Sequence, residues 1–405
     1  MLYQFMFQNF KSYKNETIFD MRAENMKEFE EAVITDKNGE KLLPVSVIYG
    51  PNAGGKSGLI EAFMCFISLV LKPRMLLKKQ EGKKDTFYFG NEVKPYKLDD
   101  NSSKQPTKFQ VYFSTNQCEY RYQLSVLNEK IMHESLYKKE FKAKKPAKIF
   151  EREGKQITLG EILRKTNSSS NVNDNMPYLT FLSITNQIAI IVDVIEWFEK
   201  IIAINYARES WEDNPAICKE ETKKLFFDFM RGMDIDIQDY RMEEREGEPD
   251  TRKLFVKHQN YQKEYELDFC DESEGTKKLF NLIPYIIEAI RRGGLVILDE
   301  LDAKLHPKLL KYIIHIFKNR ELNEKNAQLI FTSQDLTTMN PEVFRRDEIW
   351  FACKNERKES EIYSLYEIRD ENGEHIRANA PFYKQYLAGK YGADPYLSKM
   401  LNWEE

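Results

Sequence analysis

Eight residues beginning at Gly50 have the types and spacing of a phosphate-binding loop. The segment Gly50–Ser57 reads GPNAGGKS, which satisfies the pattern G-x-x-x-x-G-K-[ST]. Glycine at the two fixed positions lets the backbone wrap closely around phosphate oxygens, because side chains there would obstruct the loop and restrict φ. Consecutive backbone N–H groups then face the anion at the start of the following helix. The pattern predicts an ATP site, with nucleotide contacts from Gly50, Asn52, Ala53, Gly54, Gly55, Lys56, Ser57 and Gly58.

The two residues that end this segment would carry charge and bind metal. Lys56 would supply positive charge to the β and γ phosphates, and the Ser57 hydroxyl would be a ligand of Mg²⁺. An ordinary turn is disfavoured by the flanks: PVSVI before the loop is typical of a buried parallel strand, and SGLIEAFMCFISLVL after it is typical of a buried helix.

A pair of carboxylates forms the second chemical signal. Four apolar residues, Leu295–Leu298, run directly into Asp299 and Glu300, so a central strand would place both acids at its carboxyl end. Open α/β sheets bind ligands at that edge. We expect Asp299 to hold Mg²⁺ and Glu300 to orient and deprotonate the attacking water. The alternative, a strand that simply ends in surface acids, is disfavoured by the phosphate loop upstream.

The elements that position these residues follow from periodicity. Alternating residues near the N-terminus and over about 106–138 predict paired strands and a β-meander. Residues from about 167 to 246 have helical periodicity, and strand-like pieces return with RKLFVKHQ and GGLVILDELD. No heptad pattern persists long enough for an extended coiled coil. The order of elements indicates an α/β fold.

Composition limits the class of protein. The chain has 405 residues, 41% of them hydrophobic, and a formal net charge of −4, so no global field favours nucleic acid or membrane. Its five cysteines are scattered, which disfavours a disulfide framework or a zinc site. We find no signal peptide and no bilayer-spanning run, so a soluble, cytoplasmic protein is expected. The lysine-rich stretches Leu76–Asp85 and Lys138–Lys148 are interpreted as solvated loops rather than nucleic-acid patches.

A third motif points to a family. Ser273 is a good helix N-cap, and Gly275 permits close backbone approach at the start of the helix. The order SEG, four apolar residues with DE, and LDAKLHP resembles the signature, Walker B and D-loop series of ABC-type ATPase heads. More narrowly, the chain resembles the RloA-type relatives of the SMC and OLD (overcoming-lysogenization-defect) ATPases of bacterial antiphage systems. The pieces that carry this resemblance are NFKSY, LPVSVIYGPNAGGKS, HESLYK, ESEGTKKLF, LVILDELDAKLHP, FTSQD, FRRDEIWF and YKQYLAGKYGADP.

The resemblance implies an architecture and further site residues. It implies an ABC-type P-loop ATPase head with a β-meander subdomain and a helical insertion. The expected parts are an N-terminal ATPase lobe over 1–150, a mainly helical insertion over 151–255 and a C-terminal ATPase lobe over 256–405. Ser273 and Gly275 would contact the γ-phosphate bound to the opposite subunit, and Asp302 would lie at the dimer seam. Lys11 and Ser12 match positions near the nucleotide in relatives.

The chain departs from the family pattern at two positions. Gly54 stands where relatives commonly have serine, a change expected to be sterically harmless. Gln334 stands where the switch histidine usually lies. Glutamine can hydrogen-bond a phosphate but cannot carry a proton, so hydrolysis is expected to be slow and ATP to act mainly as a clamp. No residue between Cys65 and Glu134 stands out as the Q-loop glutamine.

These features lead to one hypothesis of function and two alternatives. About a hundred residues follow Glu300 and are accounted for by ATPase elements, so no Toprim nuclease domain is expected within the chain. The leading hypothesis is an ATP-dependent homodimer, or higher oligomer, that senses infection and controls a separate RloB-like or Toprim-type effector. The alternatives are an SMC-like ATPase that clamps DNA through patches such as Lys78–Lys84, and a scaffold that binds ATP with little turnover. The trigger and the effector's target leave no sequence signal.

Overall fold

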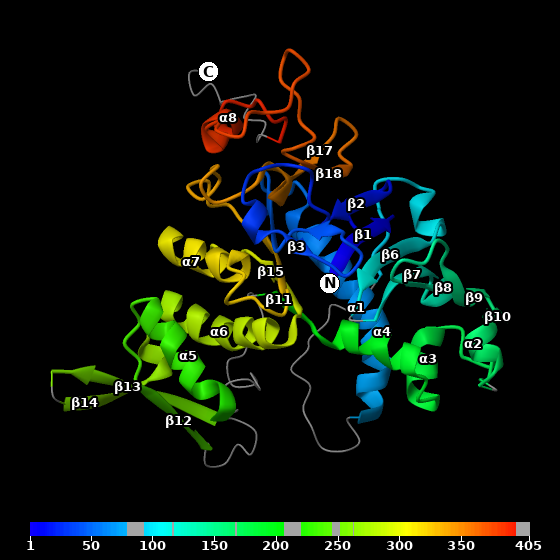
Figure 1. The fold of residues 1–405 in the computed structure, drawn as a ribbon, viewed down its shortest axis with the longest axis horizontal. Helices are drawn as coiled ribbons and strands as arrows, with labels where there is room; N and C mark the ends of the chain where they lie inside the picture. Colours follow the sequence, from blue (N-terminus) through cyan, green and yellow to red (C-terminus); the bar gives the residue numbers. More distant parts are fainter. Residues whose placement is uncertain are drawn as a thin grey trace.

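The computed structural model describes residues 1–78, 93–115, 117–166, 168–205, 220–244, 252–261 and 263–393. Figure 1 shows a central sheet with helices on both sides, a second sheet beside the N-terminus and a smaller unit that projects from α5 and α6. The fold is mixed α/β, as the sequence predicted. The longest helix among the described residues, α1 (Lys56–Lys78), has 23 residues, and no long coiled coil is present in this part of the chain.

The central sheet positions the predicted site. Its strand order is β11-β15-β16-β5-β17-β18. The five strands from β11 to β17 are parallel, and β18 pairs antiparallel with β17. The bounds are β11 Ile201–Asn205, β15 Leu295–Asp299, β16 Gln328–Thr332, β5 Val45–Tyr49, β17 Ile349–Lys354 and β18 Ser360–Ser364. Because the parallel strands end at the same edge, the residues that follow β5, β15, β16 and β17 lie close together.

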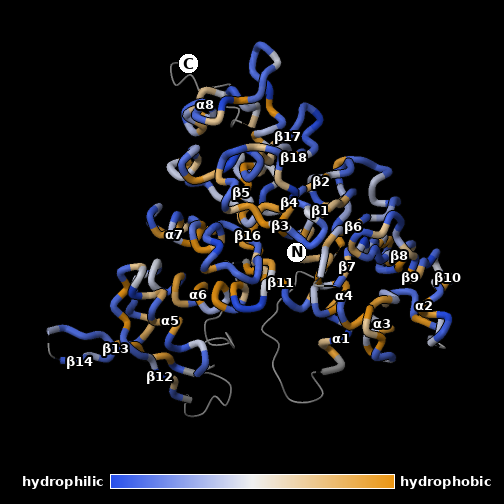
Figure 2. The backbone as a smooth tube through the Cα atoms, viewed as in Figure 1, coloured by the Kyte–Doolittle hydropathy of each residue, from blue (hydrophilic) through white to orange (hydrophobic). Residues whose placement is uncertain are grey.

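Two hydrophobic cores lie on opposite faces of this sheet. Ile48 of β5 and Ile297 of β15 belong to the core shared with α1, whereas Val47 and Leu298 belong to the core shared with α6 (Glu274–Arg292) and α7 (Pro307–Lys318). Neighbouring side chains along a strand point to opposite faces, so both faces must be apolar. Figure 2 shows the resulting concentration of hydrophobic residues along the central strands.

The N-terminal lobe contains the predicted meander, β6 to β8, extended by β9 and β10 on one side and by β1 and β2 on the other. Its antiparallel order is β10-β9-β8-β7-β6-β1-β2. The bounds are β1 Leu2–Gln8, β2 Thr17–Asp20, β6 Thr107–Ser114, β7 Cys118–Leu127, β8 Lys130–Glu140, β9 Ala147–Glu153 and β10 Gln156–Leu159. Helix α1 packs against this sheet through stacked aromatic rings, with centroids 3.7 Å apart for Phe5 and Phe63 and 5.5 Å apart for Phe66 and Phe109.

A buried carboxylate fastens the meander to the next helices. Glu134, from the segment HESLYK, accepts hydrogen bonds from the Tyr122 hydroxyl at 2.9 Å and from the backbone N–H groups of Tyr178 at 2.6 Å and Leu179 at 2.9 Å. Arg152 is also fully buried, 3.9 Å away. Burial raises the pKa of Glu134, and these hydrogen bonds oppose the rise. The motif therefore has a structural role in this lobe.

The segment 151–255, predicted to be mainly helical, is mixed. Its helices are α2 Glu161–Arg164, α3 Tyr178–Thr185, α4 Ala189–Glu199 and α5 Glu220–Gly232. Helical periodicity over about 167–246 predicts a helix here, but α4 ends at Glu199, and Ile201–Asn205 forms strand β11 beside β15. Three isoleucines in five residues favour a strand once a partner strand is present. The expectation of a mainly helical insertion is therefore wrong for β11, which belongs to the central sheet.

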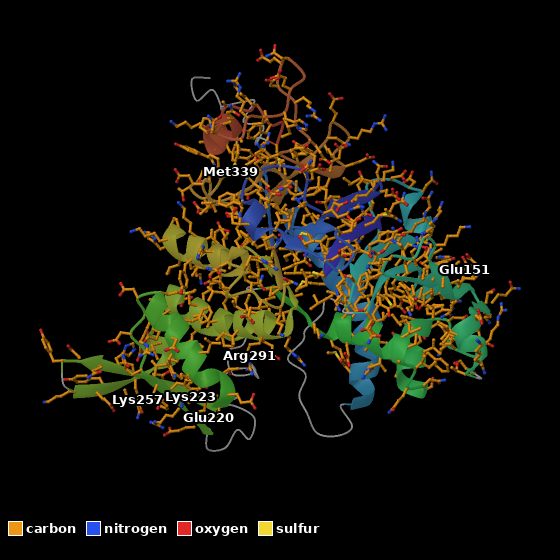
Figure 3. All side chains as sticks on the ribbon, in the orientation of Figure 1. Glu151, Glu220, Lys223, Lys257, Arg291 and Met339 are labelled. Carbon is orange, nitrogen blue, oxygen red and sulfur yellow. The ribbon has the colours of Figure 1, made fainter. Side chains whose placement is uncertain are left out.

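A third sheet lies before the signature motif. Strands β12 (Asp239–Glu244), β13 (Arg252–Asn260) and β14 (Lys263–Asp268) are antiparallel. They pack on α5 and α6, where the ring of Tyr240 in β12 lies 6.2 Å from that of Phe226 and 5.6 Å from that of Phe280. Lys223 of α5 and Lys257 of β13 lie in this unit (Figure 3). Residues of a 3₁₀ turn, Phe269–Asp271, then lead into α6.

The remaining elements are short. They are β3 Ile34–Thr35, β4 Lys41–Leu42, α8 Phe382–Leu387 and 3₁₀ turns at Glu30–Ala32, Ser102–Lys104 and Arg346–Glu348. Met339, labelled in Figure 3, anchors α8, because its carbonyl accepts a hydrogen bond from Tyr383 N at 3.2 Å. Among the described residues no single helix could cross a membrane, and only the pair α3 and α4, bent by 113°, passes that test together.

Candidate nucleotide-binding site

The glycine loop joins β5 to α1 at the carboxyl edge of the central sheet, where it is in close contact with other segments of the chain. Gly50 and Gly55 have φ values of 143° and 128°, which residues with a side chain rarely adopt. A Cβ on Gly50 would lie 2.1 Å from Ala352 O, and one on Gly55 would lie 2.7 Å from the Tyr13 hydroxyl. Both glycines are therefore required by backbone conformation and by space.

Gly54 is required as well. The sequence led us to expect only that glycine would be harmless where relatives have serine. In the structure a Cβ on Gly54 would lie 2.4 Å from Ala352 O and 3.0 Å from Pro51 O. Both neighbours are backbone atoms that cannot rotate away, so this position of the loop has no room for a side chain.

Two residues outside the motif hold the loop in shape. The Tyr13 hydroxyl donates to Gly55 O at 3.0 Å. Ser360 Oγ lies 2.8 Å from Gly54 O, to which it donates, and 2.8 Å from Ser12 Oγ. Ser360 N also donates to Ser12 O at 2.8 Å. The loop is thus supported by the N-terminal segment, 42 residues away in sequence, and by strand β18, 306 residues away.

Lys56 is the first residue of α1 and is nearly buried. Its Nζ donates to Gly50 O at 2.7 Å and to Pro51 O at 3.2 Å. Burial lowers the pKa of Lys56, and the carboxylates that follow β15, Asp299 and Glu300, oppose that shift. The amine is therefore oriented inside the loop by two carbonyl oxygens. Asn52, Ala53 and Ser57 are exposed at its mouth.

The predicted carboxylates lie where β15 ends, and Thr332 at the end of β16 orients them. Thr332 Oγ1 donates to Asp299 Oδ1 at 2.7 Å and accepts from Glu300 N at 2.7 Å. Glu300 has a left-handed φ of 55°, and its side chain is exposed at the edge. Thr332 was not predicted as a site residue.

The segment after β16 brings Gln334 to the same place. Its side-chain Nε2 lies 3.5 Å from Glu300 Oε1, and its backbone N donates to Asp302 Oδ2 at 3.0 Å. The other oxygen, Asp302 Oδ1, is buried and has no hydrogen-bond partner among the described residues. The structure thus brings together Gln334, Glu300 and Asp302.

The signature loop, Ser273–Gly275, has a different setting. Ser273 caps α6, with Thr276 N donating to its Oγ at 3.1 Å, and it is exposed. A Cβ on Gly275 would lie 2.9 Å from Lys304 O. The hydrogen bonds of the Ser273 side chain within the described residues go to Thr276 and not to the glycine loop.

Lys278, one turn along α6, connects the signature helix to the backbone of the segment that follows β15. It is nearly buried, and its Nζ donates to Glu300 O at 2.7 Å and to Ala303 O at 2.8 Å. Such a clamp fixes the backbone around the left-handed Glu300. Sequence reasoning missed Lys278 because a lysine on a helix reads as a solvated residue.

Of the two N-terminal candidates, Ser12 lies beside the glycine loop, whereas the Lys11 side chain is paired with α1. Ser12 Oγ would be 3.7 Å from a Cβ on Gly58 and binds Ser360. Lys11 forms an ion pair with Glu61 of α1, and its backbone N donates to Lys94 O at 2.7 Å. Burial lowers the pKa of Lys11.

A cleft opens beside the outer face of the glycine loop. Its walls come from the loop, the segment after β16, the end of β17 and α8 with its following turn. Lining residues include Asn52, Gln334, Lys354, Lys358 and Leu387. Residues 79–92, which cover most of the patch at Lys78–Lys84, lie outside the described residues, so no Q-loop residue or DNA contact is assigned there.

The residues fit ATP with Mg²⁺. Three glycines let the loop pass against Ala352 and Tyr13 without a side chain, a lysine amine lies inside the loop, and hard oxygen ligands from Ser57 and Asp299 are available at one edge. Within the described residues no group of three or more His, Cys, Asp or Glu side chains gathers to hold a metal without a nucleotide. The roles of the individual residues stay predictions.

This chain matches a family model and several solved structures. The family model described as "AAA domain, putative AbiEii toxin, Type IV TA system" matches residues 45–340, more than half of the chain. Similar solved structures include the SMC head domain from Thermotoga maritima (12% identity, 90% of this chain, 98% of that chain, TM-score 0.41). Another is the Smc head domain with an extended coiled coil, bound to the C-terminal domain of ScpA, derived from Pyrococcus furiosus (13% identity, 90% and 96% covered, TM-score 0.36). No curated protein matches the sequence.

Proposed function

Because this chain belongs to the AAA-domain family that matches residues 45–340, we propose that it binds and slowly hydrolyses ATP as a dimer of ABC-type heads and controls a separate effector. The observation that carries the proposal is the different setting of two loops that would bind phosphate, the glycine loop and the signature loop. The glycine loop has a lysine and two carboxylates beside it, whereas the exposed Ser273 makes its side-chain hydrogen bonds within its own helix. A second copy would bring the two loops together.

Each site would use residues of one chain for phosphate and metal. Backbone N–H groups of the loop and the Lys56 amine would hold the phosphates, and Ser57 and Asp299 would hold Mg²⁺, which neutralises charge on the phosphate oxygens when bound. Glu300 would orient the attacking water and accept its proton. Gln334 would hydrogen-bond the terminal phosphate but could not exchange protons, which supports slow turnover.

The second chain would complete each site. A helix N-terminus with a serine hydroxyl is a favourable partner for a phosphate, and Ser273 and Gly275 provide both. Asp302 would lie at the seam, where its buried Oδ1 lacks a hydrogen-bond partner among the described residues of one chain. ATP would then favour the paired state, with coupling of about 1–3 kcal/mol per site.

The proposed biological role rests on the family. The matched description names a toxin of a type IV toxin–antitoxin system, which supports a role in growth control or defence. Our proposal places toxicity in a separate effector, of the RloB-like or Toprim type, that binds one nucleotide state better than the other. Expression of this chain alone tests that point, because growth arrest without an effector would assign the toxicity to the chain itself.

The central experiment compares mass and ATP turnover of the wild type, Lys56→Ala and Glu300→Gln, each with and without ATP and Mg²⁺. We expect Glu300→Gln to form dimers or larger species with ATP. The mass of Lys56→Ala in solution should be the same with and without ATP. A mass that never responds to nucleotide in any of the three proteins would contradict the dimer.

A structural scaffold is the second candidate, and Gln334 is the observation that favours it. Its amide lies at 3.5 Å from Glu300, at the limit of a hydrogen bond, and no proton carrier takes the place of the switch histidine. If the wild type binds ATP but releases no phosphate, and Glu300→Gln changes nothing, ATP is a fixed ligand and the scaffold is correct.

A further inference from the structure

A basic hairpin lies one strand beyond the glycine loop. We use this name for the turn between β17 and β18, with Lys354, Arg357 and Lys358 as its cations. All three are exposed, and their side chains form no ion pair within the described part of the chain. Glu356 is the one exposed acid of the turn, so positive charge predominates. The proposed function assigns no role to these three side chains.

The hairpin is anchored where β18 begins and borders the cleft. Its last acid, Glu359, is buried and accepts a hydrogen bond from Asn15 at 2.9 Å, and Ser360 is bound to the glycine loop. Lys354 and Lys358 both line the cleft beside that loop. Three unpaired cations on a fixed turn are thus presented next to the mouth of the nucleotide site.

An acidic loop precedes the signature helix. We use this name for Asp271, Glu272 and Glu274, which flank Ser273. Asp271 is exposed and forms no ion pair within the described residues. Glu272 is bound to His258 Nε2 at 2.6 Å and Glu274 to Lys304 at 2.8 Å, so the loop has a fixed course and leaves Asp271 to solvent.

The order of elements along the sheet edge relates these two surfaces. Passing from the signature loop, one meets the D-loop at Lys304, then the ends of β15, β16, β5 and β17. In a two-fold dimer with its axis near the D-loop, the glycine loop of one copy faces Ser273 of the other. The hairpin lies one strand, about 4.8 Å, farther from the axis. In that arrangement it would face the residues that flank Ser273.

We propose that in the ATP-bound dimer the basic hairpin of one copy docks on the acidic loop of the second copy, with Lys354 and Lys358 beside Asp271. The inference rests on the proposed function and adds the contact that sets the register of the pair. Opposite charges across an interface mainly guide association and select the correct partner surface. Two copies of this contact would frame the two nucleotide sites.

The test is a charge swap in the Glu300→Gln background, which retains bound ATP. One variant carries Lys354→Glu and Lys358→Glu, a second carries Asp271→Lys, and a third carries all three changes. A matched control, Lys144→Glu with Lys145→Glu, makes the same charge change in the exposed turn between β8 and β9. Sedimentation measures the dimer dissociation constant with ATP, and titration of a fluorescent ATP analogue measures nucleotide affinity.

We expect each reversal to weaken the dimer at least tenfold, the combined variant to recover most of that loss, and the control to stay within about threefold of the parent. A parent that dimerises while both reversals leave its dissociation constant unchanged overturns the docking contact and leaves the proposed function standing. A parent that never dimerises overturns both. A hairpin reversal that lowers ATP affinity in step with dimerisation, or that instead weakens binding to a DNA duplex, assigns the hairpin to nucleotide or DNA and also overturns the contact.

Discussion

The glycine loop and the signature loop both begin helices near the same sheet edge, yet the chain fixes them to different degrees. At the glycine loop, three elements contact the backbone closely: β17 through Ala352, β18 through Ser360 and the N-terminal segment through Tyr13. At the signature loop, Ser273 is exposed, and the nearest atom to a Cβ on Gly275 would be Lys304 O, at 2.9 Å. One loop is enclosed by its own chain, and the other is left open.

This difference indicates that ATP binding and dimerisation depend on different loops. A loop whose shape is fixed before the ligand arrives loses little entropy on binding, so one copy should bind ATP without a partner. A helix N-terminus that faces solvent gains its favourable interaction only when an anion is brought to it. Changes at the glycine loop should therefore alter nucleotide affinity, and changes around the signature loop should alter dimerisation or turnover.

The largest effect is expected from Gly54→Ser. A serine Cβ would meet the Ala352 carbonyl at 2.4 Å, and relief of this overlap would distort the loop at a cost of roughly 1–3 kcal/mol. ATP affinity should fall about ten- to a hundredfold, measured by calorimetry. Gly58→Ala is the matched control, because its Cβ would be 3.3 Å from the Tyr13 ring, and it should stay within about threefold. An unchanged affinity for Gly54→Ser would show that the loop is less enclosed than the comparison holds.

Lys278→Met should act on turnover. Methionine keeps much of the buried volume but loses two hydrogen bonds from a charged amine, each worth about 1.5–3 kcal/mol. The backbone at Glu300 would then be less constrained, so turnover should fall about tenfold while ATP affinity is kept. Lys311→Met, on the exposed side of α7, serves as the control. A thermal melt must accompany the assay, since a protein that has simply unfolded would lose both properties.

The chemical residues of the site were predictable from sequence because their types are dictated by the ligand. A phosphate cradle needs glycines, a lysine and a hydroxyl at set intervals, and a metal site at a strand end needs an acid directly after an apolar run. Gly50–Ser57, Asp299 and Glu300 all lie at one edge as that reasoning requires. The meander was equally visible, since alternation over three long strands has no helical interpretation.

The residues that support the site were not predictable, because each is a single common residue whose partner is distant in sequence. Ser360 and Gly54 are 306 positions apart, and Thr332 is 33 from Asp299. Strand β11 was missed for a different reason. A short apolar run directly after a helix continues the helical pattern, and only pairing with β15 decides for a strand.

Gly275→Ala should affect pairing alone. Its Cβ would lie 2.9 Å from Lys304 O, a smaller overlap than at Gly54, and it would push the signature loop away from the D-loop. We expect the ATP-dependent dimer of Glu300→Gln to weaken about fivefold, with nucleotide affinity of the monomer unchanged. Loss of ATP affinity here would mean that the signature loop also shapes its own chain's site, which would remove the distinction between the two loops.

Ser360→Ala should give the smallest effect and tests how the glycine loop is enclosed. The change removes one neutral hydrogen bond to Gly54 O, worth about 1 kcal/mol, while the steric contacts with β17 remain. ATP affinity should therefore fall about threefold to fivefold. Ser12→Ala alone and together with Ser360→Ala completes a double-mutant cycle, and a coupling energy near zero would show that the two hydroxyls do not act as a unit. If Ser360→Ala were as damaging as Gly54→Ser, hydrogen bonding rather than exclusion of side chains would be what forms the loop.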